Sequence, residues 1–225
     1  MSAAGVFVTG TDTGIGKTWV SVGLLDAWRT RGLNVAGMKP VASGSELIQG
    51  ELRNEDALAL QAAASRDWPY ATINPYAFAP PIAPHVAAEQ AGVTVALEPL
   101  TAAYAELAAA SDRVVVEGVG GWRVPLSVTL QTADLVRALD LPVVLVVGLR
   151  LGCINHALLT AEAIRADGLA LRGWIANTLD PDYEAEATLA TLAAAIPAPL
   201  LARVPYAATA DARCWQSLAE ARVFD

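Results

Sequence analysis

The stretch TGTDTGIGKT, residues 9–18, decides the fold of this chain of 225 residues. It follows the short apolar run Val6–Val8 and precedes a helix predicted over residues 17–31. A glycine-rich turn between a strand and a helix lets backbone N–H groups point at phosphate oxygens. Lys17 would add a positive charge there, and the Thr18 hydroxyl could bind Mg²⁺. The stretch therefore predicts a phosphate-binding loop in a protein that hydrolyses a nucleotide or transfers a phosphoryl group.

The spacing of this loop is unusual. The common pattern has four residues between its two glycines, whereas five separate Gly10 from Gly16. Taken alone, an ordinary turn before a helix is the alternative interpretation. The order of strand, turn and helix favours phosphate binding, with the nucleotide contacted by Thr13, Gly14, Ile15, Gly16, Lys17 and Thr18.

Apolar runs rich in valine and leucine alternate with helical patterns along the whole chain. We predict strands over residues 5–9, 35–40, 113–117, 143–147, 171–177 and 200–204. We predict helices over residues 17–31, 55–65, 84–90, 99–110, 133–139, 155–166 and 182–195, and a surface loop over the proline-rich residues 71–84. This alternation predicts a single α/β domain over residues 1–225, with a doubly wound, mostly parallel sheet and helices on both faces, like P-loop nucleotide triphosphatases.

Composition excludes several classes of function. The net charge is −8 and no run rich in lysine or arginine occurs, which weighs against a nucleic-acid partner. No apolar run approaches the ~20 residues that span a bilayer, and no secretory signal is evident. The two cysteines, Cys153 and Cys214, lack metal-ligand spacing. We therefore expect a cytoplasmic protein without a membrane partner.

Parallel sheets bind ligands beyond the carboxyl ends of their strands, so the residues there are the candidates for chemistry. Lys39 ends the second predicted strand, and beside a phosphate loop it would stabilise a transferring phosphoryl group. Glu117 ends the third and is followed by Gly118, Val119 and Gly120, where a ligand could approach the backbone closely. An acid in that position resembles the carboxylate that handles Mg²⁺ in phosphate-loop enzymes. Asp56, taken alone, is an acid matched to a helix dipole.

Later strand ends add weaker candidates. Gly152, Cys153, Ile154 and Asn155 precede or open a helix, whose free N–H groups suit a carboxylate or phosphate. Alternatively, Asn155 is only an N-cap. Cys153 has no obvious base beside it, which disfavours a nucleophile. Asn177 follows the fifth predicted strand and Pro205 the sixth.

Taken together, these motifs resemble the dethiobiotin synthetase family. The likeness rests on VTGTDT (8–13), GKT (16–18), KPVASG (39–44), Asn54 with Asp56-Ala57, NPY (74–76), VEG (116–118), GGW (120–122) and LGCINH (151–156), and it runs to about Pro205. The five-residue gap in the phosphate loop is a feature of that family. The chain is thus similar to an ATP-dependent cyclo-ligase of biotin synthesis, a homodimer that would convert 7,8-diaminopelargonic acid, CO₂ and MgATP to dethiobiotin, ADP and phosphate.

The resemblance also implies roles for residues. Lys17 would hold the β- and γ-phosphates, and Lys39 the carbamate and the transferring phosphoryl group. Thr18, Asp56 and Glu117 would ligate Mg²⁺, which overturns the dipole-only interpretation of Asp56. Hydroxyl groups of Thr13 and Ser43 would bind the carbamate or substrate, and residues 152–155 the substrate carboxylate across the dimer interface. Asn177 with Pro205, Tyr206 and Ala207 would recognise adenine.

Two positions depart from the family. Some members carry aspartate where this chain has Thr178, and a tyrosine that contacts substrate is expected where it reads Ala187-Thr188-Leu189. Tyr183 lies several residues earlier. Adenine preference and contacts with the substrate tail are the details that these departures affect.

Three alternatives belong to other classes. A switch ATPase of the partitioning or division-site group would place a second lysine where Asp12 stands, and would carry a basic amphipathic helix at its C-terminus for a membrane. A sibling ligase that amidates cobyrinic or cobyric acid would need a glutamine-hydrolysing domain. A non-catalytic nucleotide-binding module would leave Lys39, Asp56 and Glu117 without a purpose.

Overall fold

Strands and helices alternate along the chain in a computed structural model that describes residues 4–206 and Trp215. Their order is β1 (Ala4–Gly10), α1 (Lys17–Thr30), β2 (Val35–Met38), β3 (Val41–Ser43), β4 (Glu46–Ile48), β5 (Glu51–Arg53), α2 (Glu55–Ala63), α3 (Tyr70–Ile73), β6 (Tyr76–Phe78), α4 (Pro84–Gln90), α5 (Leu97–Ala109), β7 (Arg113–Glu117), α6 (Thr132–Leu139), β8 (Val143–Leu149), α7 (Cys153–Ala166), β9 (Leu171–Thr178), α8 (Glu186–Ala195) and β10 (Leu200–Val204).

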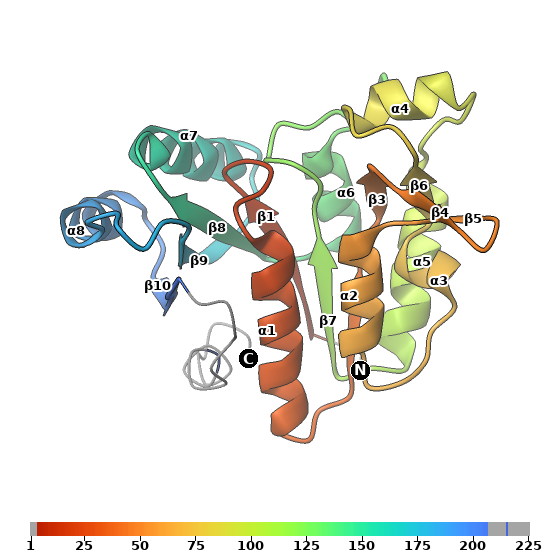
Figure 1. Cartoon of the computed structure of the whole chain (residues 1–225), viewed down its shortest axis with the longest axis horizontal. Helices are drawn as coiled ribbons and strands as arrows, with labels where there is room; N and C mark the ends of the chain where they lie inside the picture. Colours follow the sequence, from red (N-terminus) through yellow and green to blue (C-terminus); the bar gives the residue numbers. More distant parts are fainter. Residues whose placement is uncertain (1–3, 207–214, 216–225) are drawn as a thin grey trace.

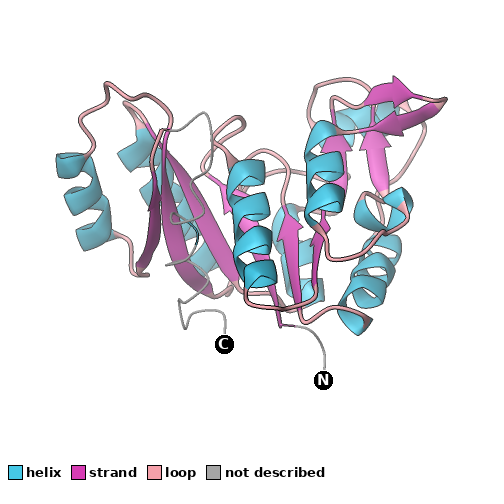
Figure 2. Ribbon diagram, turned by 60° about the horizontal axis from the view of Figure 1, so that its bottom comes forward, coloured by secondary structure: helices cyan, strands magenta, loops and turns pink. Residues whose placement is uncertain are grey.

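The main sheet of the described residues has the order β10-β9-β8-β1-β7-β2, and every strand pairing in it is parallel. Helices cover both of its faces (Figures 1 and 2). The predicted doubly wound α/β fold is thereby confirmed. Because β1 lies between β7 and β8, the loop that follows β1 is placed beside the loops that follow those strands.

The central strands are hydrophobic on both faces because each face packs against helices. In β1, Val6 and Val8 join the cluster that contains the buried side of α1. Phe7, which lies between them, belongs to the cluster on the opposite face of the sheet. Its ring packs edge-on against that of Trp122, with 6.4 Å between the ring centroids. All residues of β8 are buried. The valine and leucine runs therefore predicted these strands correctly.

The prediction of a surface loop over residues 71–84 is wrong. This stretch contains the end of α3, strand β6 and the start of α4, and β6 pairs in parallel with β3. Ile73 and Phe78 are buried in the core, in the cluster that also contains Phe7 and Met38. The prolines stand outside the paired residues of β6, where a missing N–H costs no ladder hydrogen bond.

Four predicted helix starts also differ, among them those of α5, which begins at Leu97 instead of Pro99, and of α6, which begins at Thr132 instead of Ala133. The last predicted helix begins at Glu186 instead of Asp182, because Asp180 accepts hydrogen bonds from the backbone N–H groups of Asp182 and Tyr183 and forms a turn. The helix predicted from Asn155 begins at Cys153. Among the described residues, no helix is long and apolar enough to cross a bilayer.

We predict that Gly37→Ala destabilises the fold. A Cβ atom at Gly37 in β2 would stand 2.8 Å from the Cβ of Leu60 and 3.1 Å from Cδ1 of Leu25, so α2 could not keep its present distance from the sheet. Overpacking of this kind costs about 1–3 kcal/mol in the free energy of unfolding. Urea denaturation measures it, with circular dichroism to show that the variant folds. An unchanged midpoint would contradict the close packing of α2 on β2.

Candidate active site

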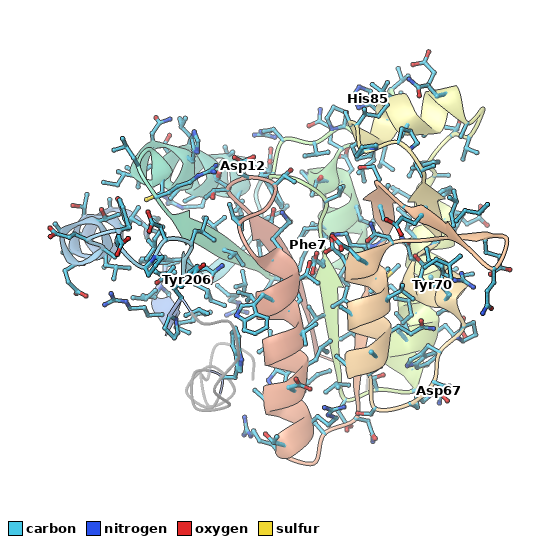
Figure 3. The ribbon with its side chains drawn as sticks, in the orientation of Figure 1. Phe7, Asp12, Asp67, Tyr70, His85 and Tyr206 are labelled. Atoms are coloured by element: carbon cyan, nitrogen blue, oxygen red, sulfur yellow. The ribbon has the colours of Figure 1, made fainter. Side chains whose placement is uncertain are left out.

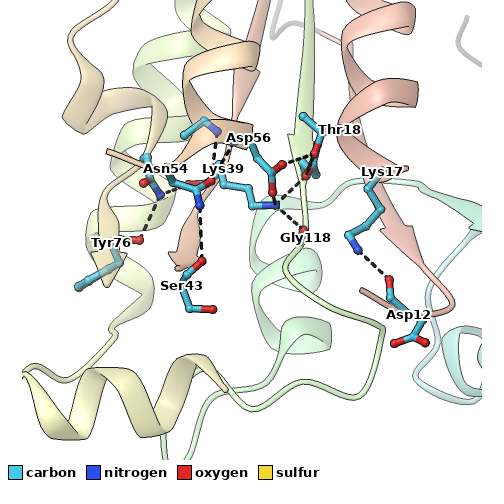
Figure 4. Close-up of polar contacts among 12 residues, drawn as sticks. Asp12, Lys17, Thr18, Lys39, Ser43, Asn54, Asp56, Tyr76 and Gly118 are labelled. Atoms are coloured by element: carbon cyan, nitrogen blue, oxygen red, sulfur yellow. Dashed lines mark hydrogen bonds and ion pairs between the residues drawn. The ribbon is translucent and has the colours of Figure 1, made fainter. Parts of the chain in front are cut away.

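The centre of the site is a buried lysine held between two carboxylates (Figure 4). The Nζ atom of Lys39 lies 2.6 Å from Oε1 of Glu117 and 2.8 Å from Oδ2 of Asp56. It also donates a 3.2 Å hydrogen bond to the backbone oxygen of Gly118. Glu117 is fully buried and Lys39 is 3% exposed, whereas the side chain of Asp56 is 34% exposed. Three strand and helix ends therefore bring one positive and two negative charges together.

The electrostatics of this cluster favour the charged forms. Burial opposes the charge of Lys39, but Glu117 and then Asp56 outweigh it, so the pKa of the Lys39 ammonium is raised. Burial likewise opposes the charge of Asp56, and the neighbouring Lys39 outweighs it, so the pKa of the Asp56 carboxyl is lowered. Lys39 and Asp56 consequently stay ionised around neutral pH.

Thr18 connects the phosphate loop to the cluster. Its hydroxyl lies 2.7 Å from Oδ1 of Asp56 and 2.9 Å from Oε1 of Glu117. Oε2 of Glu117 is buried and has no hydrogen-bond partner among the described residues. Three oxygen-bearing side chains thus converge, and one buried carboxylate oxygen has no described partner. Hard divalent cations such as Mg²⁺ prefer oxygen ligands, so this donor set fits that ion. No group of three or more His, Cys, Asp or Glu suited to a metal occurs within the described residues, so phosphate or water oxygens would have to complete the shell.

Lys17 turns back on its own loop. Its Nζ donates a 2.9 Å hydrogen bond to the backbone oxygen of Asp12 (Figure 4). Burial, and then the positive charge of Lys39, lower the pKa of Lys17 to about 8. Lys17 and Lys39 both line one cavity, and two positive side chains there favour an incoming anion.

The backbone of Lys39 is fixed by residues that were not assigned a role from the sequence. The Asn74 amide donates to the backbone oxygens of Lys39 at 2.6 Å and Tyr76 at 3.1 Å. The Tyr70 hydroxyl donates to Asn74 and accepts from the backbone N–H of Asn54. Asn54 in turn caps α2, accepting from the N–H groups of its first turn, and so fixes the place of Asp56. An asparagine before two acids was the available signal for this cap.

An open cavity of about 840 Å³ lies over the cluster. Its walls include Thr13, Gly14, Gly16, Lys17, Thr18, Lys39, Ser43, Asp56, Val119 and Gly120, all predicted site residues. Ile15, Glu117 and Gly118 are buried behind this surface. The structure thus brings the phosphate loop, Ser43 and the turn after β7 around one space. Residues 81–84 and 123–125 complete the wall and were missed, because nothing in their sequence marks a binding surface.

The predicted residues 152–155 lie outside this cavity. Gly152, with φ +92°, is the N-cap of α7, so the alternative that Asn155 is the N-cap is wrong. Gly152 and Asn155 are exposed, Ile154 is half-buried and Cys153 is buried. Within one chain this segment is joined to the phosphate loop through Arg150, whose guanidinium lies 2.5 Å from the carboxylate of Asp12. Figure 3 labels Asp12 on the loop between β1 and α1.

Of the residues predicted to recognise adenine, the structure describes Asn177, Pro205 and Tyr206. Asn177 is buried at the end of β9, where its Nδ2 donates a 2.8 Å hydrogen bond to the backbone oxygen of Ile15. It therefore supports the phosphate loop, a role that its sequence position did not reveal. Pro205 and Tyr206 are exposed, and Ala207 lies outside the described residues.

Comparisons with known proteins identify the family. The model of a family described as "AAA domain" matches residues 4–213. An ATP-dependent dethiobiotin synthetase of Xanthomonas oryzae pv. oryzae is 58% identical over 213 residues, which are 94% of this chain and 95% of the relative. That of Xylella fastidiosa strain 9a5c is also 58% identical, over 92% of each chain. The chain belongs to the ATP-dependent dethiobiotin synthetase family. The resemblance that its motifs indicated is thereby confirmed.

Solved structures show how widely this synthetase fold is shared. The MinD cell division protein of Aquifex aeolicus aligns with a TM-score of 0.61 and 12% identity, covering 96% of this chain and 95% of its own. A ParA family ATPase of Chlorobium tepidum aligns with a TM-score of 0.55 and 14% identity, covering 99% and 92%. At such identities these likenesses show the fold alone, and the 58% identical synthetases decide the family.

We predict that nucleotide binding takes up a proton above neutral pH. Because the pKa of Lys17 is about 8, that lysine is mostly neutral at pH 8.5, and a phosphate beside it would raise its pKa again. Binding of MgADP at pH 8.5 should take up about half a proton or more, and far less at pH 7. Calorimetry in buffers of different ionisation enthalpy measures this uptake. Lys17→Met is the control, and an equal uptake by that variant would assign the proton to another group.

Proposed function

We propose that this chain catalyses the ATP-dependent carboxylation and ring closure of 7,8-diaminopelargonic acid to dethiobiotin. The coarser statement, an ATP-dependent cyclo-ligase of the dethiobiotin synthetase family, follows from the 58% identical relatives. The observation that carries the finer proposal is Lys39, an ammonium group between Asp56 and Glu117 that faces a cavity lined by the phosphate loop. It places a fixed positive charge where the two substrates would meet.

The first step forms a carbamate. One amine of the substrate attacks the carbon of CO₂, and a proton leaves that nitrogen for solvent. The product carries a new negative charge on its two oxygens. The ammonium of Lys39 would bind that charge, with hydroxyl donation from Thr13 and Ser43, both of which line the cavity.

The second step activates the carbamate. A carbamate oxygen attacks the γ-phosphorus of ATP, the bond from that phosphorus to the bridging oxygen breaks, and ADP leaves with the electron pair. The product is a carbamic–phosphoric anhydride. Lys17 and Lys39 would stabilise the charge that spreads over the phosphoryl oxygens. In the structure Lys17 donates to its own loop at Asp12, so binding would exchange that contact for one with phosphate.

The third step closes the ring. The second amine attacks the carbonyl carbon of the anhydride. The bond between that carbon and the oxygen bridging to phosphorus breaks, and inorganic phosphate leaves as the attacking nitrogen loses a proton. Thr18, Asp56 and Glu117 would hold Mg²⁺, which neutralises charge on the nucleotide phosphates when bound. The unpartnered Oε2 of Glu117 supports this assignment.

The remaining assignments extend the same proposal. The exposed start of α7, residues 152–155, would bind the substrate carboxylate of a second copy in a homodimer. Its position outside the cavity of its own chain agrees with such a role. Asn177 would recognise adenine together with residues 205–207 while it supports the loop. We further propose that residues 1–225 form a single domain that works in the cytoplasm with no nucleic-acid partner.

Incubation with diaminopelargonate, MgATP and ¹⁴C-bicarbonate tests the reaction. We predict labelled dethiobiotin from the wild type. Lys39→Gln should lower kcat by about a hundredfold or more, because the charge that stabilises the carbamate and phosphoryl group is removed. Near-normal turnover by a folded Lys39→Gln variant would contradict the role of Lys39. Wild-type protein that yields no labelled product would refute the proposed reaction.

Asp56→Ala tests the metal assignment. If Asp56 is a ligand, the Mg²⁺ concentration for half-maximal activity should rise about tenfold or more. Glu98→Ala is a matched control, because Glu98 is also an acid in the first turn of a helix, α5, but is exposed and does not line the cavity. An unchanged Mg²⁺ requirement in Asp56→Ala would restore the dipole-only interpretation of Asp56.

A further inference from the structure

The glycine turn, residues 118–121 after β7, lies against the phosphate loop. A Cβ atom built on Gly121 would stand 3.6 Å from the backbone oxygen of Gly10 and 3.7 Å from that of Thr11. A Cβ on Gly120 would stand 3.7 Å from the hydroxyl of Thr13. A displacement of the turn would therefore change the space that the cavity offers to its ligands.

The first end of the glycine turn is fixed from within the site. The N–H of Gly118 donates a 2.9 Å hydrogen bond to the backbone oxygen of Val8, and its own oxygen accepts from Lys39. This end is thus attached to the sheet and to the charged cluster. The second end leads directly into Trp122 and Arg123, so its position depends on what holds those two side chains, together with the hydrogen bonds that the backbone oxygen of Val124 accepts from Thr132.

Asp167 holds both of them. The indole Nε1 of Trp122 donates to Oδ2 of Asp167 at 2.7 Å, and Nη1 of Arg123 donates to Oδ1 at 2.9 Å. Trp122 is 3% exposed, whereas the Arg123 side chain is 53% exposed. A hydrogen bond from a buried donor to a charged acceptor outweighs a solvent-exposed ion pair, so Trp122 is the more important partner.

Asp167 is itself well fixed. It is the residue after α7, and its N–H donates to the backbone oxygen of Ala163 at 3.0 Å. Its backbone oxygen accepts from the guanidinium of Arg137 on α6 at 3.1 Å. Two helices therefore fix the backbone of Asp167, whose carboxylate receives the Trp122 indole.

We propose that Asp167 is a positioning residue for the reaction of this enzyme, acting through Trp122 on the wall of residues 123–125. That wall and residues 81–84 line the same cavity as Ser43, which would bind the substrate. The inference rests on the proposed function, because it assigns this side of the cavity to the diamine. The phosphate loop has supports of its own, including the Asn177 amide. Loss of the Asp167 contact should therefore weaken diamine binding more than nucleotide binding.

Steady-state kinetics of two Asp167 variants test this. Asp167→Ala leaves the Trp122 indole without its acceptor, and we expect KM for the diamine to rise roughly tenfold while kcat and the dissociation constant for MgADP change less than about twofold. Asp167→Asn keeps an oxygen acceptor and should stay within about twofold of the wild-type KM. Asp26→Ala is the control, because Asp26 also pairs with an arginine, Arg29 on α1, although its side chain is more exposed than that of Asp167. It should leave all constants unchanged.

A double-mutant cycle identifies the residue through which Asp167 acts. Trp122→Phe keeps the ring against Phe7 but removes the N–H donor. In that background Asp167→Ala should add less than about a further twofold to KM, because the shared contact is already lost. Fully additive effects would show that Asp167 does not act through Trp122. Equal losses in kcat, MgADP binding and thermal stability would show a general structural role and overturn the proposal.

A spectroscopic measurement separates this inference from the proposed function. The indole ¹H–¹⁵N resonance of Trp122, assigned by its loss in Trp122→Phe, should shift in Asp167→Ala and stay near its place in Asp167→Asn. An unshifted resonance in Asp167→Ala would refute the contact whether or not the protein makes dethiobiotin. If the wild type is active and Asp167→Ala has a normal diamine KM, the proposed function stands and the positioning role of Asp167 fails.

Discussion

The buried ion pair between Lys39 and Glu117 is the constraint on which the site depends. Neither side chain has more than 3% exposure, so each charge would be costly without the other. Because β2 and β7 are neighbours in the sheet, their ends place the two groups together on a rigid support. Thr18 and Asp56 then join the same oxygen cluster from α1 and from the start of α2.

In this cluster one positive charge faces two negative charges, so a further cation could bind there. Two carboxylates share one lysine, and one Glu117 oxygen has no partner within the part of the chain that the structure describes. Nearby, burial and Lys39 depress the pKa of Lys17, so the inner end of the phosphate loop favours an anion. Such fixed charges in a partly enclosed site need little rearrangement when a substrate arrives, which is the property that electrostatic catalysis requires.

Much of the fold followed from sequence periodicity. The runs of valine in β7 and β8 and the glycine–lysine–threonine turn fixed the order of the central elements. The failures are local and have physical reasons. Residues 71–84 were predicted as a loop because prolines flank the short strand β6. Its only described partner is the equally short β3. The network of Asn54, Tyr70 and Asn74 under Lys39 was also missed, because hydrogen bonds between side chains distant in sequence leave no periodic signal.

The sequence by itself determined the phosphate loop, the alternation that builds a parallel sheet, and the motifs by which the family is recognised. Those properties depend on local conformation and on residue type. Only the tertiary structure decided that Asn177 supports the loop, that residues 81–84 and 123–125 face one cavity, and that Asp167 receives the Trp122 indole. Each of these is a contact between segments far apart along the chain, and the packing of helices on the sheet sets the distance between them.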